Sequence, residues 1–478
     1  MLGEFSEPRL GAGSTRLVTA MQALQLVCLA WVVWLPVSRG YVLYPAMLLV
    51  FATSAAILLA RRQRPSRGLV VAWGVYYTWA LAWTAVSWAW GNPGVWHQAT
   101  LWLGLPLLWG TWALSLDAPQ VRRTLRMLMV IGAVSATLTL WLVASGVWGL
   151  PGLPAWLVEI QDTRVNVSSV TGETAFNWLG LSAFIGIGSV AICGAMLPTA
   201  DEWLPPRWLL VLTGALVFCS AGASGRNGLL LALIVVIAAA GVVGMVVQTL
   251  QGGVRALPRY IGALVLTAVA LAGFAASPLG VNVELLASEV AAVVTPGDES
   301  TEPPDSGTGS DTDTDTDTDT DTERDPINEV EAESDRIRRA MFPQLVDAGL
   351  EQPLWGQGFG ATLDSGFTRS DERPWMFEVE PLQAFMNVGL LGFVVLCFPV
   401  LLLARACLRE VRVGTHLRAV VSGAAVFGAV VLASATNPYL QAPGHGWMVF
   451  IAGGLAHAAL GSRRTQQESV GASIDSDA

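Results

Sequence analysis

The chain has 478 residues, of which 53% are hydrophobic and 13% are charged. Soluble proteins carry about a quarter charged residues, so this composition excludes an ordinary soluble protein and indicates that lipid solvates most of the chain. The formal net charge of -10 comes from one acidic segment. That segment argues against a nucleic-acid partner, because it would repel phosphate groups.

Twelve stretches are predicted to cross a bilayer, because each approaches the roughly 20 mainly apolar residues that a membrane-spanning helix requires. The predicted fold is therefore an all-α polytopic membrane protein. The polar segment Met1–Arg16 leads into the first stretch without a small-residue cleavage site, so we expect a retained helix and no signal peptide. The predicted spans are Leu17–Pro36, Tyr41–Ala60, Gly68–Trp90, Gln98–Leu116, Met127–Val147, Phe176–Leu197, Trp208–Ala223, Asn227–Leu250, Tyr260–Ser277, Pro381–Ala404, Ala419–Ala435 and Trp447–Leu460.

Arginine positions indicate which ends of these helices face the cytoplasm, since short cytoplasmic loops collect basic residues. With both termini cytoplasmic, 18 of the 27 arginines fall on the cytoplasmic side. We therefore predict four parts along the chain. Residues 1–278 form the first nine transmembrane helices, 279–380 a large outer periplasmic loop, 381–462 the last three transmembrane helices, and 463–478 a disordered cytoplasmic tail.

The outer loop contains 25 of the 37 acidic residues but only six arginines. Residues 295–325 are low in complexity, and Asp alternates with Thr from Asp311 to Thr322. This run resembles a calcium-binding segment, but it lacks the glycine and the closing glutamate with which calcium loops fold around the ion. We expect a disordered spacer that its own charges extend. Residues 334–360 are expected to form an ordered helix and a glycine-rich turn.

Cysteine and histidine positions predict neither a disulfide framework nor a metal site. None of the five cysteines falls in the outer loop. The four histidines lie in separate segments, so each is expected to be a packing or hydrogen-bonding residue, and no metal or other cofactor is expected. These residues are Cys28, Cys193, Cys219, Cys397 and Cys407, and His97, His416, His445 and His457.

The helix of the outer loop carries a conspicuous arginine. Ser334 is its predicted N-cap, and Arg338 projects from the middle of its apolar face. An arginine on a packing face requires an anion beside it. That anion is either a ligand or, in an internal salt bridge, Glu378 or Glu380. Pro343 is expected to kink or split this helix.

Downstream of this helix, Gly356, Gly358 and Gly360 alternate with other residues. Such spacing lets the backbone turn tightly and bring its N–H groups close to a ligand. Glu378 and Glu380 then precede the next span. Partial burial would raise the pKa of either carboxyl and suit it to act as a general base; the alternative is a pair of rim charges that face water.

Two more arginines lie on the outer side. Arg226 occupies a tight turn between apolar spans, at a depth where an unpaired charge costs several kcal/mol. Arg164 and Asn177 flank the entry to the sixth span. Guanidinium groups match phosphate oxygens in a planar fork. Arg164, Arg226 and Arg338 are therefore candidates to bind a diphosphate at the lipid–water boundary.

The order of these outer elements resembles the O-antigen ligase and polymerase superfamily, membrane enzymes that transfer glycans from a polyprenyl-diphosphate carrier. The family's loop often carries a His-Asn pair, and Glu378 and Val379 stand in its place here. An acidic residue there is closer to the polymerases than to the ligases. The matching elements are Ser224-Gly225-Arg226-Asn227-Gly228, Arg164 with Asn177, Arg338 with Phe342, Pro353-Leu354, the Gly356/Gly358/Gly360 run, Leu382-Gln383 and Gly389/Gly392.

The resemblance implies a polymerase in the bacterial inner membrane that joins carrier-linked oligosaccharide repeats by metal-independent, inverting glycosyl transfer. The arginines would stabilise the leaving diphosphate, Glu378 or Glu380 would deprotonate the acceptor, and Asn177 and the glycines would support the site. Implied partners are the polyprenyl-diphosphate-linked glycan, membrane lipid, a flippase and a chain-length regulator. Two alternatives stay open: a ligase of the same fold, and a transporter, which only the number of spans favours.

Overall fold

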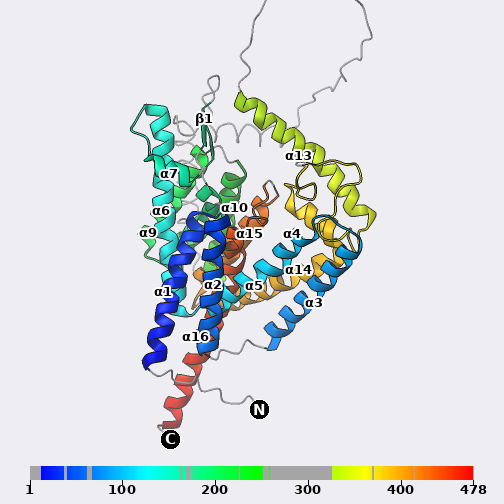
Figure 1. The fold of residues 1–478 in the computed structure, drawn as a ribbon. Helices are drawn as coiled ribbons and strands as arrows, with labels where there is room; N and C mark the ends of the chain where they lie inside the picture. The colour runs from blue at the N-terminus through cyan, green and yellow to red at the C-terminus, as the bar shows by residue number, and fades with distance from the viewer. Residues whose placement is uncertain are drawn as a thin grey trace, which may run out of the picture.

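The computed structural model describes residues 12–36, 40–61, 67–161, 164–167, 174–177, 179–224, 227–250, 258, 326–368, 371–413, 415–435 and 437–476. Most helices in these ranges run between two opposite ends of the molecule (Figure 1). One end carries α13 (Pro326–Glu351), and α16 (Gly446–Ser476) finishes at the other (Figure 1). We call these the α13 end and the α16 end.

The chain passes repeatedly between these ends. A π-helical turn at Thr100–Gly104 joins α4 to α5, and short 3-10 turns at Leu179–Ser182 and Pro443–His445 precede α8 and α16. The remaining helices are α1 (Ala12–Trp34), α2 (Gly40–Arg61), α3 (Arg67–Ala89), α4 (Val95–Ala99), α5 (Leu105–Ser115), α6 (Ala118–Trp148), α7 (Ala155–Ile160), α8 (Ala183–Met196), α9 (Arg207–Ala223), α10 (Asn227–Leu250), α14 (Glu380–Val413) and α15 (Leu417–Ala433).

The described helices have the character of a membrane-embedded protein. Stretches within α1, α2, α6, α10 and the first half of α14 are long and apolar enough to cross a bilayer, while α8, α9 and α15 are apolar but shorter. Leu48, Val75 and Val394 are more than half exposed, as expected where lipid is the solvent. The predicted class, an all-α membrane protein, is therefore confirmed. The predicted span at 260–277 lies outside the described residues.

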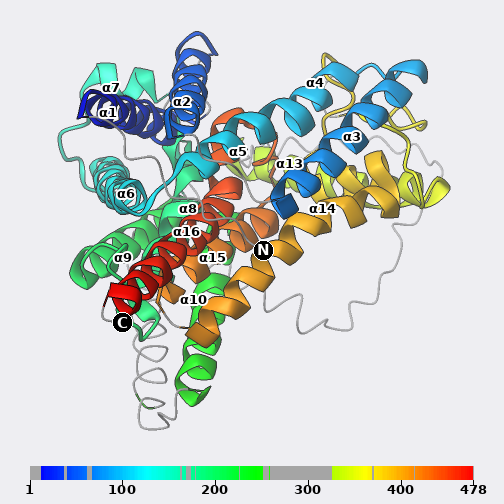
Figure 2. The same ribbon diagram turned by 90° about the horizontal axis from the view of Figure 1, so that it is seen from below.

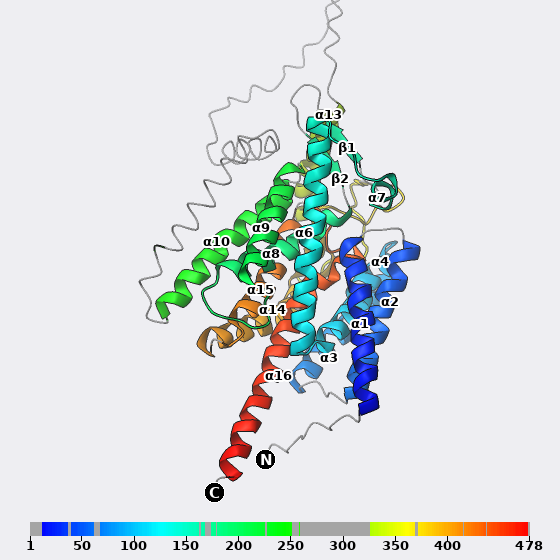
Figure 3. The ribbon, with the colours of Figure 1, turned by 90° about the vertical axis from the view of Figure 1, so that its left-hand side faces the viewer.

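One short β-hairpin interrupts the helical pattern. β1 (Arg164–Val167) pairs antiparallel with β2 (Thr174–Asn177), beside α7 at the α13 end (Figure 3). The predicted sixth span was wrong at its start, because Phe176 lies in β2 and α8 begins only at Ala183. Val and Thr, whose branched side chains suit strands, are frequent in this stretch.

Two helix boundaries also differ from expectation. α13 begins at Pro326, so Ser334 lies inside the helix and is not its N-cap. Proline fits the first turn of a helix, where no N–H partner is needed. Pro343 lies within α13 without ending it. Residues 463–476, expected to be disordered, continue α16 as helix to Ser476.

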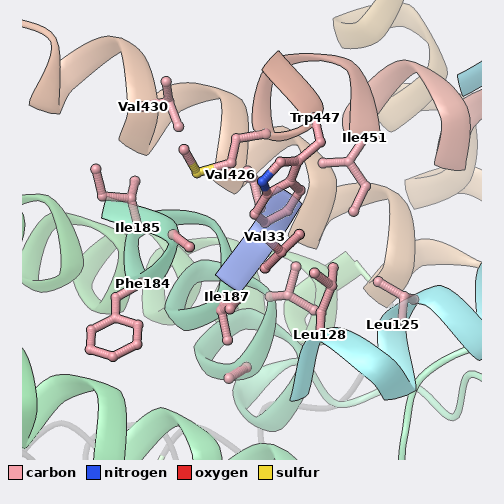
Figure 4. Close-up of a cluster of buried hydrophobic side chains, with 14 of the residues drawn as sticks. Val33, Leu125, Leu128, Phe184, Ile185, Ile187, Val426, Val430, Trp447 and Ile451 are labelled. Carbon is pink, nitrogen blue, oxygen red and sulfur yellow. The ribbon is translucent and has the colours of Figure 1, made fainter. Parts of the chain in front are cut away.

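The core gathers around α8. Seen from below, α8 lies among α6, α9, α15 and α16 (Figure 2). Gly188 allows the close approach, because a Cβ there would lie 2.7 Å from Leu233 Cδ2 in α10 and 3.0 Å from Val217 Cγ1 in α9. Figure 4 shows buried side chains of this core, from α8 and from the helices around it: Val33, Leu125, Leu128, Phe184, Ile185, Ile187, Val426, Val430, Trp447 and Ile451.

At the α16 end, the connection between α8 and α9 is fastened to α15 by a buried carboxylate. Asp201 accepts hydrogen bonds from the backbone N–H groups of Trp203 (3.1 Å) and Ala419 (3.0 Å). Ala419 lies in the first turn of α15, so Asp201 satisfies a donor that has no partner within the helix. His416 stacks on Trp203 at 3.8 Å between ring centroids. This contact fixes where α15 begins.

We expect Asp201→Ala to destabilise the protein, because it leaves two buried N–H groups without an acceptor. Losing a helix cap costs about 1 kcal/mol, so the unfolding temperature in detergent should fall measurably. Glu202→Ala is the matched control. The Glu202 carboxylate lies 3.6 Å from Arg122 in an exposed pair, and such pairs contribute little. Equal unfolding temperatures for the two variants would contradict the capping role.

Candidate functional site

A cluster of buried polar side chains lies at the α13 end. Its members come from the segment that enters α14 and from the connection between α15 and α16, residues 434–445. Glu378 is 4% exposed and Glu380 is 6% exposed. The alternative that these carboxylates are rim charges facing water was therefore wrong. We call this group the polar cluster: Glu378, Glu380, Gln383, Ser434, Gln441 and His445.

Glu380 joins the two halves of the polar cluster. Its carboxylate accepts the backbone N–H of Leu440 at 2.9 Å and of Gln441 at 2.8 Å. Its own N–H donates to the Ser434 carbonyl at 3.1 Å. Each carboxylate oxygen thus accepts one backbone N–H group, and Glu380 holds the 434–445 connection against the start of α14.

Two glutamine side chains add further hydrogen bonds around Glu380. Gln441 Nε2 donates to the Phe377 carbonyl (3.0 Å) and to Gln383 Oε1 (2.8 Å). Gln383 Nε2 in turn donates to the Trp375 carbonyl at 2.8 Å. These bonds bind the segment before α14 to the 434–445 connection, so the polar cluster has a defined geometry.

Glu378 belongs to a segment that packs against α13. The residues on either side of it, Phe377 and Val379, pack in one apolar cluster with Met341 and Leu345 of α13. A buried carboxylate requires hydrogen bonds or a positive charge to offset its lost hydration. Glu378 is thus held in a segment whose adjoining residues are anchored against α13.

The glycine-rich run has a different role from the one predicted. α14 is broken at Gly389 (φ 57°, ψ -169°), and the run supplies hydrogen bonds across the break. Gly358 N–H donates to the Asn387 carbonyl at 3.0 Å, and beyond the break the N–H of Leu390 donates to the Pro353 carbonyl at 2.8 Å. The N–H of Gly358 is therefore bonded to the protein itself and does not face a ligand.

Close backbone crossings explain the glycines. Gly356, Gly358 and Gly360 all have positive φ angles, of 73°, 89° and 72°. A Cβ on Gly356 would lie 2.6 Å from the backbone of Asn387, and one on Gly360 would lie 2.1 Å from that of Gly94. Residues with a side chain would force these segments apart, so the run is a packing element of α14.

The structure places the backbone of two of the three candidate arginines. Arg164 stands directly opposite Asn177 across the β-hairpin, which brings these two predicted positions together. Arg338 lies in α13 next to Ile337, which packs against the cluster that contains Phe377. Arg226 lies outside the described residues.

The neighbours of Arg226 lie at the level of the turn that precedes α8. Gly188 of α8 lies beside Val217 of α9 and Leu233 of α10. Moving six residues from each of these three positions toward the α13 end leads from Gly188 to Ser182, from Val217 to Ala223 and from Leu233 to Asn227. A helix rises about 1.5 Å per residue, so Ala223 at the end of α9, Asn227 at the start of α10 and Ser182 have similar heights along the bundle.

His445 and Ser182 form a polar contact that sequence analysis missed. Ser182 Oγ lies 2.5 Å from His445 Nε2, and His445 Nδ1 lies 2.7 Å from the Tyr439 carbonyl. Burial lowers the pKa of His445 to about 4, against the opposing effect of its bond to Tyr439. The imidazole is therefore neutral, so Nδ1–H donates to Tyr439 and Nε2 accepts the Ser182 hydroxyl. The contact links the base of the β-hairpin to the polar cluster.

Alanine substitutions at two glycines can distinguish the cost of a strained backbone from the cost of a steric clash. Gly356 and Gly366 both have positive φ, but a Cβ on Gly366 would meet nothing within 4 Å. Gly366→Ala should therefore cost only the strain of about 1–2 kcal/mol. We expect Gly356→Ala to lower the unfolding temperature further, because its Cβ collides with the backbone at the break in α14. Similar losses in both variants would contradict the packing role.

Comparison of the chain with protein-family models, with curated protein sequences and with solved structures finds no match. The site must therefore be judged on its own geometry.

Proposed function

We propose that this protein polymerises polyprenyl-diphosphate-linked oligosaccharide repeats into a surface polysaccharide or exopolysaccharide. The observation that carries the proposal is the burial of Glu378 and Glu380 at the same end of the bundle as β1, α13 and the adjoining ends of α9 and α10. Those elements carry or adjoin the arginines predicted to bind diphosphate. A carboxylate beside several guanidinium groups suits acid–base chemistry on an anionic substrate.

The proposal includes a topology. About twelve helices cross the bacterial inner membrane, with the α13 end on the periplasmic side and both termini in the cytoplasm. Support comes from the ends of the helices, because α1 begins and α16 ends at the α16 end (Figures 1 and 3). Arg61 ends α2 and Arg207 begins α9 at this same end, as the excess of basic residues in cytoplasmic loops requires.

In the proposed reaction the hydroxyl oxygen of the acceptor repeat attacks the anomeric carbon of the donor. The bond from this carbon to the diphosphate oxygen breaks, and the diphosphate leaves with the electron pair. Arg164, Arg226 and Arg338 stabilise the developing charge. Glu378, or Glu380 in its place, takes the acceptor proton as the general base. The transfer inverts the anomeric centre and requires no metal.

Three substitutions test this assignment. Arg226→Ala and Arg338→Ala each remove a diphosphate contact, and Glu378→Gln removes the base, so each should abolish long-chain glycan while the protein still inserts into the membrane. Gel profiles of surface glycan and immunoblots of the membrane fraction measure the two outcomes. Arg123→Ala is the control, because Arg123 is exposed on α6 near the α16 end. Wild-type polymer in all three variants would exclude the proposed enzyme.

A deletion strain distinguishes a polymerase from a ligase. A strain that lacks the gene should accumulate carrier-bound single repeats, because no enzyme joins them. Accumulation of long carrier-bound chains would instead identify the protein as a ligase.

Deletion of Asp311–Thr322 should leave polymer length unchanged, because the proposed chemistry uses none of these residues. The segment lies outside the described residues and is expected to act as a spacer. Glycan profiles of the deletion and of a variant with the same length of Gly-Ser sequence make the comparison. Loss of polymer in both variants would show that the acidic sequence itself is required.

A further inference from the structure

An exposed apolar surface extends over α13, the glycine-rich run and the neighbouring part of α14. Its members come from segments far apart in the sequence, yet each is between 52% and 59% exposed. We call this surface the rim patch; it consists of Trp90, Phe342, Leu350, Leu354, Trp355 and Leu390.

Contacts bring three of these segments together, and Leu350 near the end of α13 stands only four residues before Leu354. Trp355 stacks on Trp83 at 6.5 Å between ring centroids, and Trp83 meets Trp90 edge to face at 5.9 Å. The carbonyl of Pro353, immediately before Leu354, accepts the N–H of Leu390 at 2.8 Å. Trp90, which directly follows α3, Trp355 before the glycine-rich run and Leu390 of α14 therefore lie near one another.

α13 has a wider apolar arc than the protein covers. Met341 and Leu345 are buried against the segment before α14. Phe342 and Leu350 occupy the adjacent arc of the helix, where they are 54% and 59% exposed. The remaining arc carries polar residues, Gln344, Asp347 and Glu351. A helix between protein and water needs only one apolar face, whereas α13 has an additional one.

The rim patch leads directly onto a surface that faces lipid. Leu390 belongs to the stretch of α14, Glu380–Cys397, that is apolar enough to cross a membrane. One turn further along α14, Val394 is 62% exposed. Tryptophan is enriched where bilayers meet water, because its ring is apolar and its N–H is polar.

We propose that the rim patch is inserted into the boundary between the head groups and acyl chains of the bilayer. α13 then has three neighbours: the protein on the side of Met341, lipid on the side of Phe342 and Leu350, and water on the side of Asp347. An amphipathic helix with these three faces lies at the membrane surface. This part of the loop is therefore membrane-bound, and the inference does not depend on the proposed reaction.

Photo-crosslinking in lipid nanodiscs tests the inference at single positions. Variants Phe342→p-benzoylphenylalanine, Leu350→p-benzoylphenylalanine and Trp355→p-benzoylphenylalanine are irradiated in nanodiscs of phosphatidylcholine and phosphatidylglycerol. Peptide mass spectrometry then measures the lipid adducts at each position. Asp347 and Glu351, substituted in the same way, are matched controls on the same helix, and Val394 is the positive control. All substituted side chains are exposed, which limits the effect on folding.

We expect several-fold more lipid adduct at Phe342, Leu350 and Trp355 than at Asp347 and Glu351. Adduct at Val394 confirms that lipid is detected where the protein crosses the bilayer. Equal adduct on both arcs of α13, or adduct at Val394 alone, would overturn the inference. Crosslinks from the rim patch to a second copy of the chain would also overturn it, because they would identify protein as the partner.

Discussion

The exchange of backbone hydrogen bonds between the broken α14 and the glycine-rich run determines the geometry of the α13 end. A break in an apolar helix frees N–H and carbonyl groups that lipid cannot satisfy, and each unpaired group costs several kcal/mol. Here the partners of these groups include Pro353, Leu354, Gln357 and Gly358. Because Gly358 directly precedes Phe359, which is buried against Trp79 and Trp102, the same contact fixes α3 and the π-helical turn at Thr100–Gly104. The glycine-rich run therefore connects the helices at the α13 end and fixes their positions relative to one another.

The hydrogen bonds between α14 and the glycine-rich run also fix the position of the polar cluster. The first part of α14, from Glu380 to the break, is fixed at its far end by the glycine-rich run and at its near end by Leu440 and Gln441. Glu378 is thereby placed relative to α13 without a flexible connection. Preorganised charges cost little reorganisation during a reaction. A rigid frame of this kind is consistent with the general-base role proposed for this pair of carboxylates.

The sequence predicted the positions of the helices well, but it predicted poorly which segments contact one another. Apolar length alone located α1, α2, α6 and α10, because a bilayer imposes that length on any spanning helix. The β-hairpin was missed since its two strands of four residues are too short for a periodic signal. The glycine spacing correctly indicated tight turns, but the partner of the run lies some 30 residues later and no local pattern identifies it. The contact between Ser182 and His445 joins residues 263 apart, so the histidine looked isolated.

The membrane-surface position inferred for α13 affects the proposed reaction, because it sets the depth in the bilayer at which Arg338 lies. A polyprenyl chain lies among the acyl chains of the bilayer, so its diphosphate stands at the level of the head groups. α13 carries Arg338 on the same helix as Phe342 and Leu350, and a helix inserted at that boundary brings its arginine to the depth of the diphosphate. A soluble loop would instead have to reach down to the bilayer and lose conformational entropy at each encounter. Anchoring α13 in the interface removes that cost, which is a physical reason for an enzyme with a lipid-linked substrate to keep part of its outer loop in the membrane.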